Sequence, residues 1–409
     1  MDSKNLNHSS QEMLSGCDHD SNSVAQPSSK VIVAVNTEDE TGYFVDSEGN
    51  LLSDILFEEV SRFFDGFAKV KLNGKWGFVN AQGEVVVPCI YDGVGCFSEG
   101  LASIEQNDRC GYINTQGEVV IPCIYECAWS FTEGLAKVRQ NNQWGFINAQ
   151  GEVVIPCIYD EVDFFFGGLA PVRLNDKWGG INSLGEVVLP CTYDEIGFFS
   201  EGLVSVEQNG KCGFVKVQGD VVTPCIYDHV DCFCEGLASV KLKDKYGFIN
   251  VSGEVVVPCI YDYAWGFSNG LASVLQNGKY GFVNAQGDEA ISCIYDYAGS
   301  FYEGLASVEQ NGKSGFINTL GEVVIPFIYE DADSFNEGLA PVRLNGKWGF
   351  VNAQGEVVIP FIYEDAWGPF YNGVTKVEQN GRWNIINRKG VVIVEECDQP
   401  NTYWSKVEL

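Results

Sequence analysis

The chain has 409 residues, of which 45% are hydrophobic and 13% aromatic, with 46 glycines and two methionines. This composition is sufficient for a core and favours turns and strands over helical bundles. The formal net charge is −31. An acidic surface repels phosphates, so we expect no nucleic-acid partner and no binding to anionic membranes.

Residues 1–30 are predicted to be a disordered polar tail. They lack the apolar run of a secretory signal, and no stretch of the chain reaches the roughly 20 apolar residues of a membrane helix. We therefore expect a cytoplasmic protein without membrane insertion, unless a dedicated secretion system exports it. Its 15 cysteines are then expected to be reduced thiols. The tail holds four acids and two bases, which leaves 52 acids against 23 bases in the rest of the chain.

From residue 31 to residue 394 the chain repeats itself every 34 residues, in about ten copies with degenerate ends. A half-repeat starts the array, where Phe44 lies 34 residues before Phe78, and residues 395–409 are predicted to be a carboxyl-terminal tail. In the last copy Asn384 takes the place of the repeated glycine, one residue late because Pro369 is inserted. The glycines that set the period are Gly77, Gly111, Gly145, Gly179, Gly213, Gly247, Gly281, Gly315 and Gly349.

Two turns are readable in each repeat. The pair Asn73-Gly74 suits a two-residue type I′ hairpin, because both residues tolerate positive φ. The spacing of Asn80 and Gly83 suits a type I turn that ends in a left-handed glycine. These turns would join three short strands, LAxV, KWGFIN and EVVIP, and a loop of the form YDxxxxFxEG would lead to the next repeat.

A unit of 34 residues is too small to bury its own apolar face, so neighbouring copies must supply the stability. The sequence therefore predicts an all-β fold: a tandem array of β-meander or hairpin repeats that forms an open solenoid or superhelix. A β-propeller-like ring, or two five-bladed rings, are the alternatives. Propellers usually have four to eight blades of four strands, which ten copies of a three-stranded unit fit poorly.

The segments Lys75–Asn80 and Lys347–Asn352 read KWGFVN and are followed by Gly-Glu-Val-Val and, further on, Tyr with an acidic residue. This pattern closely resembles the bacterial WG-repeat family. The resemblance implies a β-rich fold and an interaction module, and it implies no catalytic residues. Five copies depart from the family at the tryptophan, which becomes Cys110, Cys212, Tyr246, Tyr280 or Ser314.

Three columns of the aligned repeats are predicted to be core. The tyrosines that align with Tyr91 and the phenylalanines that align with Phe97 are expected to pack between repeats, with a sugar-stacking groove as the alternative. The cysteine column that begins at Cys89 becomes Phe327 and Phe361 in later copies, which indicates a buried apolar position. We expect free thiols there, because paired strands hold successive copies too far apart for disulfides.

One local cluster contains Cys225, His229, Cys232 and Cys234. Three thiols and an imidazole could surround zinc. Their spacing matches no familiar zinc motif, and His229 occupies a loop position that other copies fill with Gly, Glu or Tyr. We expect no metal and no cofactor.

Charged columns are the candidate interaction surface, together with the tryptophans. An acidic column follows the core tyrosine, and a basic column follows the Asn-Gly turn. They are expected to be a solvated face that could attract a patterned protein partner. The candidate residues are Trp76, Trp144, Trp178, Trp348, Lys75, Lys177, Lys347, Asp92, Asp160 and Asp194.

Catalysis has little support, because His229 is the only histidine of the array and no phosphate-binding loop occurs. We expect a non-catalytic scaffold that presents an extended acidic surface to a protein partner, not an enzyme. A carbohydrate-binding array and a structural spacer or filament are the alternatives. Exposed, coplanar tryptophans would favour a glycan, and buried ones would favour a protein partner or a structural role.

Overall fold

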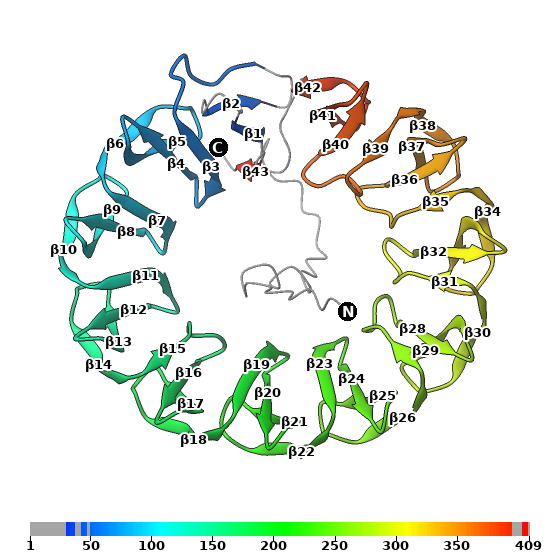
Figure 1. The fold of residues 1–409 in the computed structure, drawn as a ribbon, viewed down its shortest axis with the longest axis horizontal. Coiled ribbons are helices and arrows are strands. Elements are labelled where there is room, and N and C mark those ends of the chain that lie inside the picture. Colours follow the sequence, from blue (N-terminus) through cyan, green and yellow to red (C-terminus); the bar gives the residue numbers. More distant parts are fainter. Residues whose placement is uncertain (1–29, 37–41, 47–49, 395–402, 408–409) are drawn as a thin grey trace, which may run out of the picture.

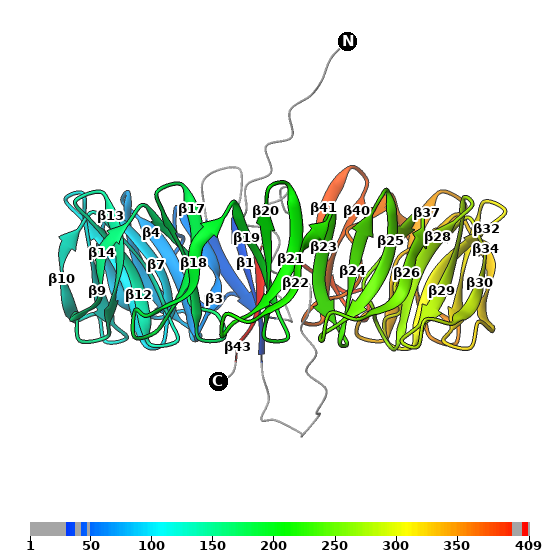
Figure 2. The same cartoon turned by 90° about the horizontal axis from the view of Figure 1, so that it is seen from below.

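The computed structural model describes residues 30–36, 42–46, 50–394 and 403–407, and every regular element in them is a β-strand. Ten four-stranded antiparallel sheets and one three-stranded sheet follow one another around a ring (Figure 1). Seen edge-on, the ring is a flat disc whose strands run across its thickness (Figure 2). Among the described residues, no helix has the length and hydropathy of a membrane span.

The first strand of each four-stranded sheet lies nearest the centre of the ring (Figure 1). Five of these inner strands are six residues long, and the other five are two residues long. They are β3 (Glu59–Phe64), β7 (Gly93–Ser98), β11 (Cys127–Thr132), β15 (Glu161–Val162), β19 (Glu195–Ser200), β23 (His229–Cys234), β27 (Tyr263–Ala264), β31 (Tyr297–Ala298), β35 (Asp331–Ala332) and β39 (Asp365–Ala366).

The second strand of each sheet carries the LAxV motif and is buried on both faces over most of its length, as expected of a strand between two sheets. The second strands are β4 (Phe67–Leu72), β8 (Leu101–Gln106), β12 (Leu135–Gln140), β16 (Leu169–Leu174), β20 (Leu203–Gln208), β24 (Leu237–Leu242), β28 (Leu271–Gln276), β32 (Leu305–Gln310), β36 (Leu339–Leu344) and β40 (Val374–Gln379).

The third strand carries the KWGFIN motif and is buried at its centre. The third strands are β5 (Lys75–Asn80), β9 (Arg109–Asn114), β13 (Gln143–Asn148), β17 (Lys177–Asn182), β21 (Lys211–Lys216), β25 (Lys245–Asn250), β29 (Lys279–Asn284), β33 (Lys313–Asn318), β37 (Lys347–Asn352) and β41 (Arg382–Asn387).

The fourth strand is the outer edge of each sheet and carries the EVVIP motif (Figure 1). The outer strands are β6 (Val85–Tyr91), β10 (Val119–Tyr125), β14 (Val153–Tyr159), β18 (Val187–Tyr193), β22 (Val221–Tyr227), β26 (Val255–Tyr261), β30 (Glu289–Tyr295), β34 (Val323–Tyr329), β38 (Val357–Tyr363) and β42 (Val392–Val394).

Both predicted turns are confirmed. Asn73 and Gly74 have φ of 52° and 71°, as a type I′ hairpin requires. Gly83 has φ of 80°, and its N–H donates to the Asn80 carbonyl at 2.9 Å. The Asn80 side chain accepts from the N–H groups of Gln82 and Glu84, both at 3.0 Å, which fixes the turn.

The YDxxxxFxEG segment, predicted as a loop, contains the inner strand and a third turn. In the second sheet this turn is Glu99-Gly100, with φ of 52° and 78°. Glutamate seldom adopts positive φ, so the sequence gave no ordinary turn signal. The inner strand was missed because its pairing is short and is interrupted by a bulge, for example between Val94 and Phe97.

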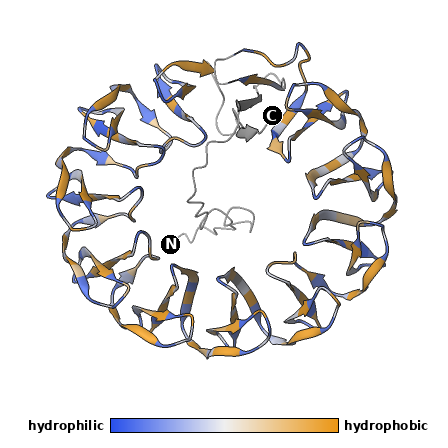
Figure 3. Ribbon diagram, turned by 180° about the vertical axis from the view of Figure 1, so that it is seen from behind, coloured by the Kyte–Doolittle hydropathy of each residue, from blue (hydrophilic) through white to orange (hydrophobic). Residues whose placement is uncertain are grey.

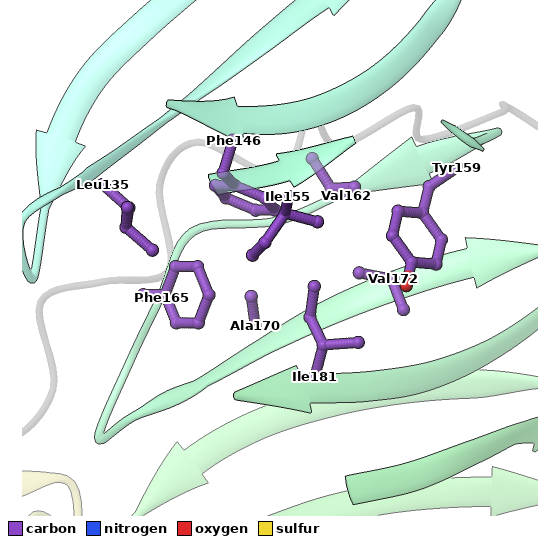
Figure 4. Packing of buried hydrophobic residues seen from close by; sticks show 9 residues of the cluster. All are labelled: Leu135, Phe146, Ile155, Tyr159, Val162, Phe165, Ala170, Val172 and Ile181. Atoms are coloured by element: carbon purple, nitrogen blue, oxygen red, sulfur yellow. The ribbon is translucent and has the colours of Figure 1, made fainter. Parts of the chain in front are cut away.

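The main core lies between neighbouring sheets, and Figure 4 shows one such seam. Four of its residues come from the sheet of β11–β14 and five from the sheet of β15–β18. The rings of Phe146 and Phe165 meet edge to face across the seam, with centroids 4.9 Å apart. The nine residues are Leu135, Phe146, Ile155, Tyr159, Val162, Phe165, Ala170, Val172 and Ile181. The prediction that the tyrosine and phenylalanine columns pack between repeats is confirmed.

One seam lacks this aromatic pair, because Gly180 stands in the position of Phe146. Leu169 fills the space: its side chain is fully buried, and a Cβ on Gly180 would lie 2.9 Å from Leu169 Cδ1. The seam is thus an apolar volume that different side chains can fill, as expected for core packing that depends on total volume.

The three-stranded sheet joins the two ends of the array. Its strands β2 (Gly42–Asp46), β1 (Lys30–Asn36) and β43 (Tyr403–Val407) pair in that order, so both termini contribute to it. Successive residues of a strand face opposite sides. Phe44 accordingly packs on the first four-stranded sheet, near Phe57 and Phe63, and Val45 packs on the last, near Val374 and Ile385.

The predicted all-β tandem array is confirmed. Its separate sheets succeed one another as in a solenoid, and they are not joined into a barrel. The array curves until its ends meet, so the single propeller-like ring describes its shape, and the division into two five-bladed rings does not occur (Figure 1). The segment 395–409, predicted as a tail, includes the paired strand β43. The predicted tail of residues 1–29 lies outside the described residues.

The seam generates a direct prediction. We expect Phe165→Ala to lower the free energy of unfolding by about 3–5 kcal/mol, because it removes a buried ring and leaves a cavity. Phe165 is 1% exposed, whereas its neighbour Phe166 is 58% exposed. The matched control Phe166→Ala should therefore change stability by less than about 1 kcal/mol. Urea unfolding followed by circular dichroism measures both; equal effects of the two variants would contradict the seam.

Candidate functional site

The tryptophan–glycine motif has a packing explanation. A Cβ built on Gly77 would lie 2.4 Å from the Val87 carbonyl oxygen and 2.8 Å from the Cys89 nitrogen. The outer strand therefore crosses the third strand at a distance that only glycine permits. The ladder between β5 and β6 shifts register at this point, between the pairs Trp76–Tyr91 and Phe78–Val87. In the last repeat, where Asn384 replaces the glycine, β42 ends at Val394.

The four candidate tryptophans Trp76, Trp144, Trp178 and Trp348 are all half-buried. Trp144 packs on the seam of Figure 4, and Trp348 packs on the seam around Phe350. Basic side chains of the second strand cover the rings: the Lys71 Nζ lies 5.6 Å from the ring centroid of Trp76. These contacts are cation–π interactions within one sheet. The tryptophan column is therefore part of the fold and does not form an exposed platform.

The acidic and basic columns are paired with each other. Lys75 forms an ion pair with Asp92, whose second oxygen accepts the N–H of Asn107 at 3.1 Å. Lys75 belongs to one sheet and Asn107 to a turn of the next, so the carboxylate bridges neighbouring repeats. We call this arrangement the lysine–acid bridge. The same bridge is formed by Lys177–Asp194, Lys211–Asp228, Lys245–Asp262, Lys279–Asp296 and Lys347–Glu364.

Asp160 accepts the N–H of Asn175 at 2.9 Å, but Gln143 replaces the lysine in its repeat. In the complete bridges the carboxyl pKa is lowered. For Asp228 the hydrogen bond from Lys211 is the main cause, followed by the N–H of Lys243 at 2.8 Å. Both donors favour the ionised form of the carboxyl group. The charged candidates thus hold repeats together, a role that the sequence analysis did not assign to them.

A second acidic column also links repeats. The Glu99 carboxylate accepts the N–H of Gly134, 35 residues further on, at 3.0 Å. Glu133 and Glu201 make the same contact with Gly168 and Gly236. The hydrogen bond joins the Glu-Gly turns of successive sheets and accounts for glutamate at positive φ.

The cysteines of the described residues are free thiols, all half-buried. In the cysteine column, the Cys89 thiol lies 3.7 Å from the Val70 carbonyl oxygen of the second strand, and burial raises its pKa. Burial, with Cys127 and Glu105 nearby, raises the pKa of Cys110 to about 11. A reactive cysteine needs a lowered pKa, so neither thiol has the character of a nucleophile.

The cluster around His229 is divided between two sheets. Cys225 lies on the outer strand β22 and contacts the Val206 carbonyl, whereas His229, Cys232 and Cys234 lie on the inner strand β23. Among the described residues, no group of three or more potential ligands is arranged to hold a metal.

His229 Nε2 lies 3.2 Å from Asp231 Oδ1, and the Ser239 hydroxyl donates to the other oxygen of Asp231. In a serine nucleophile the histidine stands between serine and acid. Here the acid stands between the other two, so His229 cannot take the proton of Ser239 directly.

The outer strands expose apolar side chains around the ring. Along β6 the exposed residues are Val85, Pro88 and Ile90, and the intervening ones are buried or half-buried. The same positions hold valine, proline and isoleucine in β10, β14, β22, β26, β34 and β38. We call these exposed residues the outer rim, and Figure 3 shows hydrophobic colour on the outermost strands. The exception is β30, which has Glu289 and Ser292 in place of valine and proline.

Sequence analysis read the EVVIP motif as a strand but did not identify the outer rim. The signal was present: the motif is apolar at both phases of the strand alternation, although an edge strand has only one buried face. Recognising it required knowing that this strand is the edge of its sheet, which depends on the missed inner strand.

A protein-family model described as the WG containing repeat matches the chain in ten consecutive segments. The segments are residues 44–76, 76–110, 111–144, 144–178, 178–212, 213–246, 246–280, 280–313, 315–348 and 348–383. No curated protein matches the chain in sequence.

Among solved structures, the chain is similar to one described as the eukaryotic initiation factor, with 12% identity, TM-score 0.42, and coverage of 92% of this chain and 98% of that chain. It is also similar to KlHsv2 with loop 6CD replaced by a Gly-Ser linker, with 9% identity, TM-score 0.30, and coverage of 53% and 85%. A third is the extracellular domain of the putative hybrid two component system BT4673 from B. thetaiotaomicron, with 8% identity, TM-score 0.28, and coverage of 91% and 77%.

The lysine–acid bridge predicts a pH dependence. The pKa of Asp228 in the folded protein lies below its ordinary value of 3.8, so the bridge stabilises above pH 3.8 and is lost as pH falls through the lower, folded value. Asp228→Asn should lower the Tm modestly at pH 7, and this difference from the parent protein should shrink below pH 3.8.

The control is Asp108→Asn, a turn residue that is exposed and forms no ion pair within the described part of the chain. Its Tm difference should be small at every pH. Thermal melts from pH 2.5 to 7 make the comparison; a difference for Asp228→Asn that grows on acidification would contradict the bridge.

Proposed function

Since the chain belongs to the family of WG containing repeats, we propose that it is a non-catalytic scaffold that binds a protein partner through its outer rim. The observation that carries this proposal is the repeated exposure of large apolar side chains. Val153 and Ile158 are 55% and 48% exposed, and Val221 and Ile226 are 61% and 48% exposed. Contiguous apolar surface on a folded protein is typical of interaction sites.

The rim favours recognition by side-chain packing over the addition of a partner strand. Pro88, Pro156 and Pro224 lie in the middle of their outer strands and have no N–H to donate. Proline on an edge strand discourages pairing with another chain. A partner with its own apolar surface, such as an amphipathic helix or a row of loops, would bury valine and isoleucine without forming a ladder.

Other surfaces support a protein partner less strongly. The acidic columns that suggested an extended acidic interface accept hydrogen bonds within the array, as Asp92 and Glu99 do. The glycan alternative depended on exposed faces at Trp76, Trp144, Trp178 and Trp348, which are half-buried. The outer rim is then the broadest candidate surface that the fold does not use for itself.

The chain itself shows how to test the rim, because β30 forms its sheet with Glu289 at the valine position. The triple variant Val153→Glu, Val221→Glu and Val255→Glu copies this exception into three other sheets. We expect it to fold and to bind the partner at least tenfold more weakly, a loss of about 1.4 kcal/mol or more. The partner is identified by crosslinking and mass spectrometry, then purified, and its Kd is measured by calorimetry.

The matched control places the same charge on apolar side chains away from the rim. Leu184 and Leu320 lie in turns and are 73% and 77% exposed, so Leu184→Glu with Leu320→Glu should leave the Kd within twofold. Equal loss in both variants would mean that net charge, not the rim, governs binding. Binding of an oligosaccharide in place of any protein would favour the glycan alternative.

A further inference from the structure

One inner position of the repeat is occupied by a lysine in the third and fourth four-stranded sheets. Lys137, on β12, places its Nζ 4.0 Å from the ring centroid of Phe164, 5.1 Å from that of Trp129, and 3.5 Å from Asp163 Oδ1. Only 11% of its side chain is exposed. Aromatic faces and a carboxylate thus hold an ammonium group between two neighbouring sheets.

The equivalent position five repeats further on keeps the acid and loses the cation. Asp333 corresponds to Asp163, but Ser307 stands where Lys137 stands, and Gly299 stands where Trp129 stands. Asp333 Oδ1 accepts only local hydrogen bonds, from the N–H of Ser334 at 2.6 Å and from its hydroxyl at 3.3 Å. Within the described part of the chain Asp333 forms no ion pair. Other acids of this column are compensated: Asp231, for example, contacts His229 and Ser239.

Exposed aromatic side chains surround Asp333. Tyr297 on the preceding sheet is 46% exposed, and Trp367 and Tyr371 on the following sheet are 54% and 52% exposed. The Asp333 carboxylate contributes, after burial, to the raised pKa of Tyr371, and it also raises that of Tyr297. Both phenols therefore lie within its electrostatic reach. Asn336 hydrogen-bonds to Tyr371 and so fixes one side of the group.

We propose that Asp333, Tyr297, Trp367 and Tyr371 form a binding site for a lysine side chain presented by a partner polypeptide. This lysine would make with Asp333 the contact that Lys137 makes with Asp163. The site rests on the proposed function as a protein scaffold, but it lies on the inner strands, away from the outer rim. It deepens that proposal by naming the chemistry of a second contact.

The experiment uses the full chain and a fluorescein-labelled (Gly-Lys)4 peptide, with anisotropy measured in 150 mM NaCl so that the long-range field of the acidic protein is screened. We expect saturable binding of this peptide and none of a (Gly-Gln)4 peptide. Asp333→Asn should weaken binding about tenfold, as expected for the loss of a charged hydrogen-bond partner. Ser307→Lys should weaken it to a similar extent, because the new lysine would occupy Asp333 from within.

Two controls separate the site from net charge. Asp108→Asn removes one exposed carboxylate elsewhere, and Ser252→Lys adds one exposed ammonium elsewhere; each should leave the Kd within twofold. Absence of saturable (Gly-Lys)4 binding, or equal weakening by the controls, would overturn the site. The triple glutamate variant of the outer rim should bind this peptide with undiminished affinity, so failure at one surface is distinguishable from failure at the other.

Discussion

The packing of one sheet against the next is the interaction on which the rest of the molecule depends. A repeat of 34 residues makes a four-stranded sheet with two apolar faces, and neither face can be buried within the repeat. The Phe146–Phe165 contact and its equivalents, such as Phe214–Phe233 and Phe282–Phe301, recur with centroid distances of 4.8–4.9 Å. This constant seam sets a constant relation between neighbours, and a constant relation repeated along a chain produces regular curvature.

Polar contacts reinforce the seam at both ends of each sheet. The lysine–acid bridge joins one repeat to a turn of the next, and the Glu-Gly contact joins successive turns near the inner strands. Each is exposed and individually weak, but each recurs in most of the junctions. The closing sheet follows the same principle: Phe44 and Val45 extend the apolar packing to the first and last repeats, so the array ends without an exposed sheet face.

Much of this organisation could be predicted from the sequence, because periodicity is preserved in the residues. The period, the Asn73-Gly74 type of turn and the aromatic core columns follow from local rules. The inner strand could not be predicted so readily, because a bulge interrupts it and a glutamate at positive φ ends it. Nor could the roles of Gly77 and Asp92, which depend on the close crossing of two strands and on a turn in the next repeat.

The same comparison separates structural from functional positions. Residues that repeat faithfully, such as the core phenylalanines, build the seams. The column of Trp129, Asp163, Gly299 and Asp333 changes from repeat to repeat while the fold around it stays constant. Different sheets can therefore present different chemistry on one scaffold, apolar at the outer rim and both acidic and aromatic at the inner strands.

Hydrogen exchange resolved along the chain tests the central role of the seams most directly. Phe214→Ala removes one ring from the seam between the sheets of β19–β22 and β23–β26. If stability resides in contacts between nearest neighbours, amide exchange should accelerate in these two sheets, and the sheets on the far side of the ring should keep their protection. Uniform loss of protection in all sheets, or no change in the two sheets beside Phe214, would contradict this account.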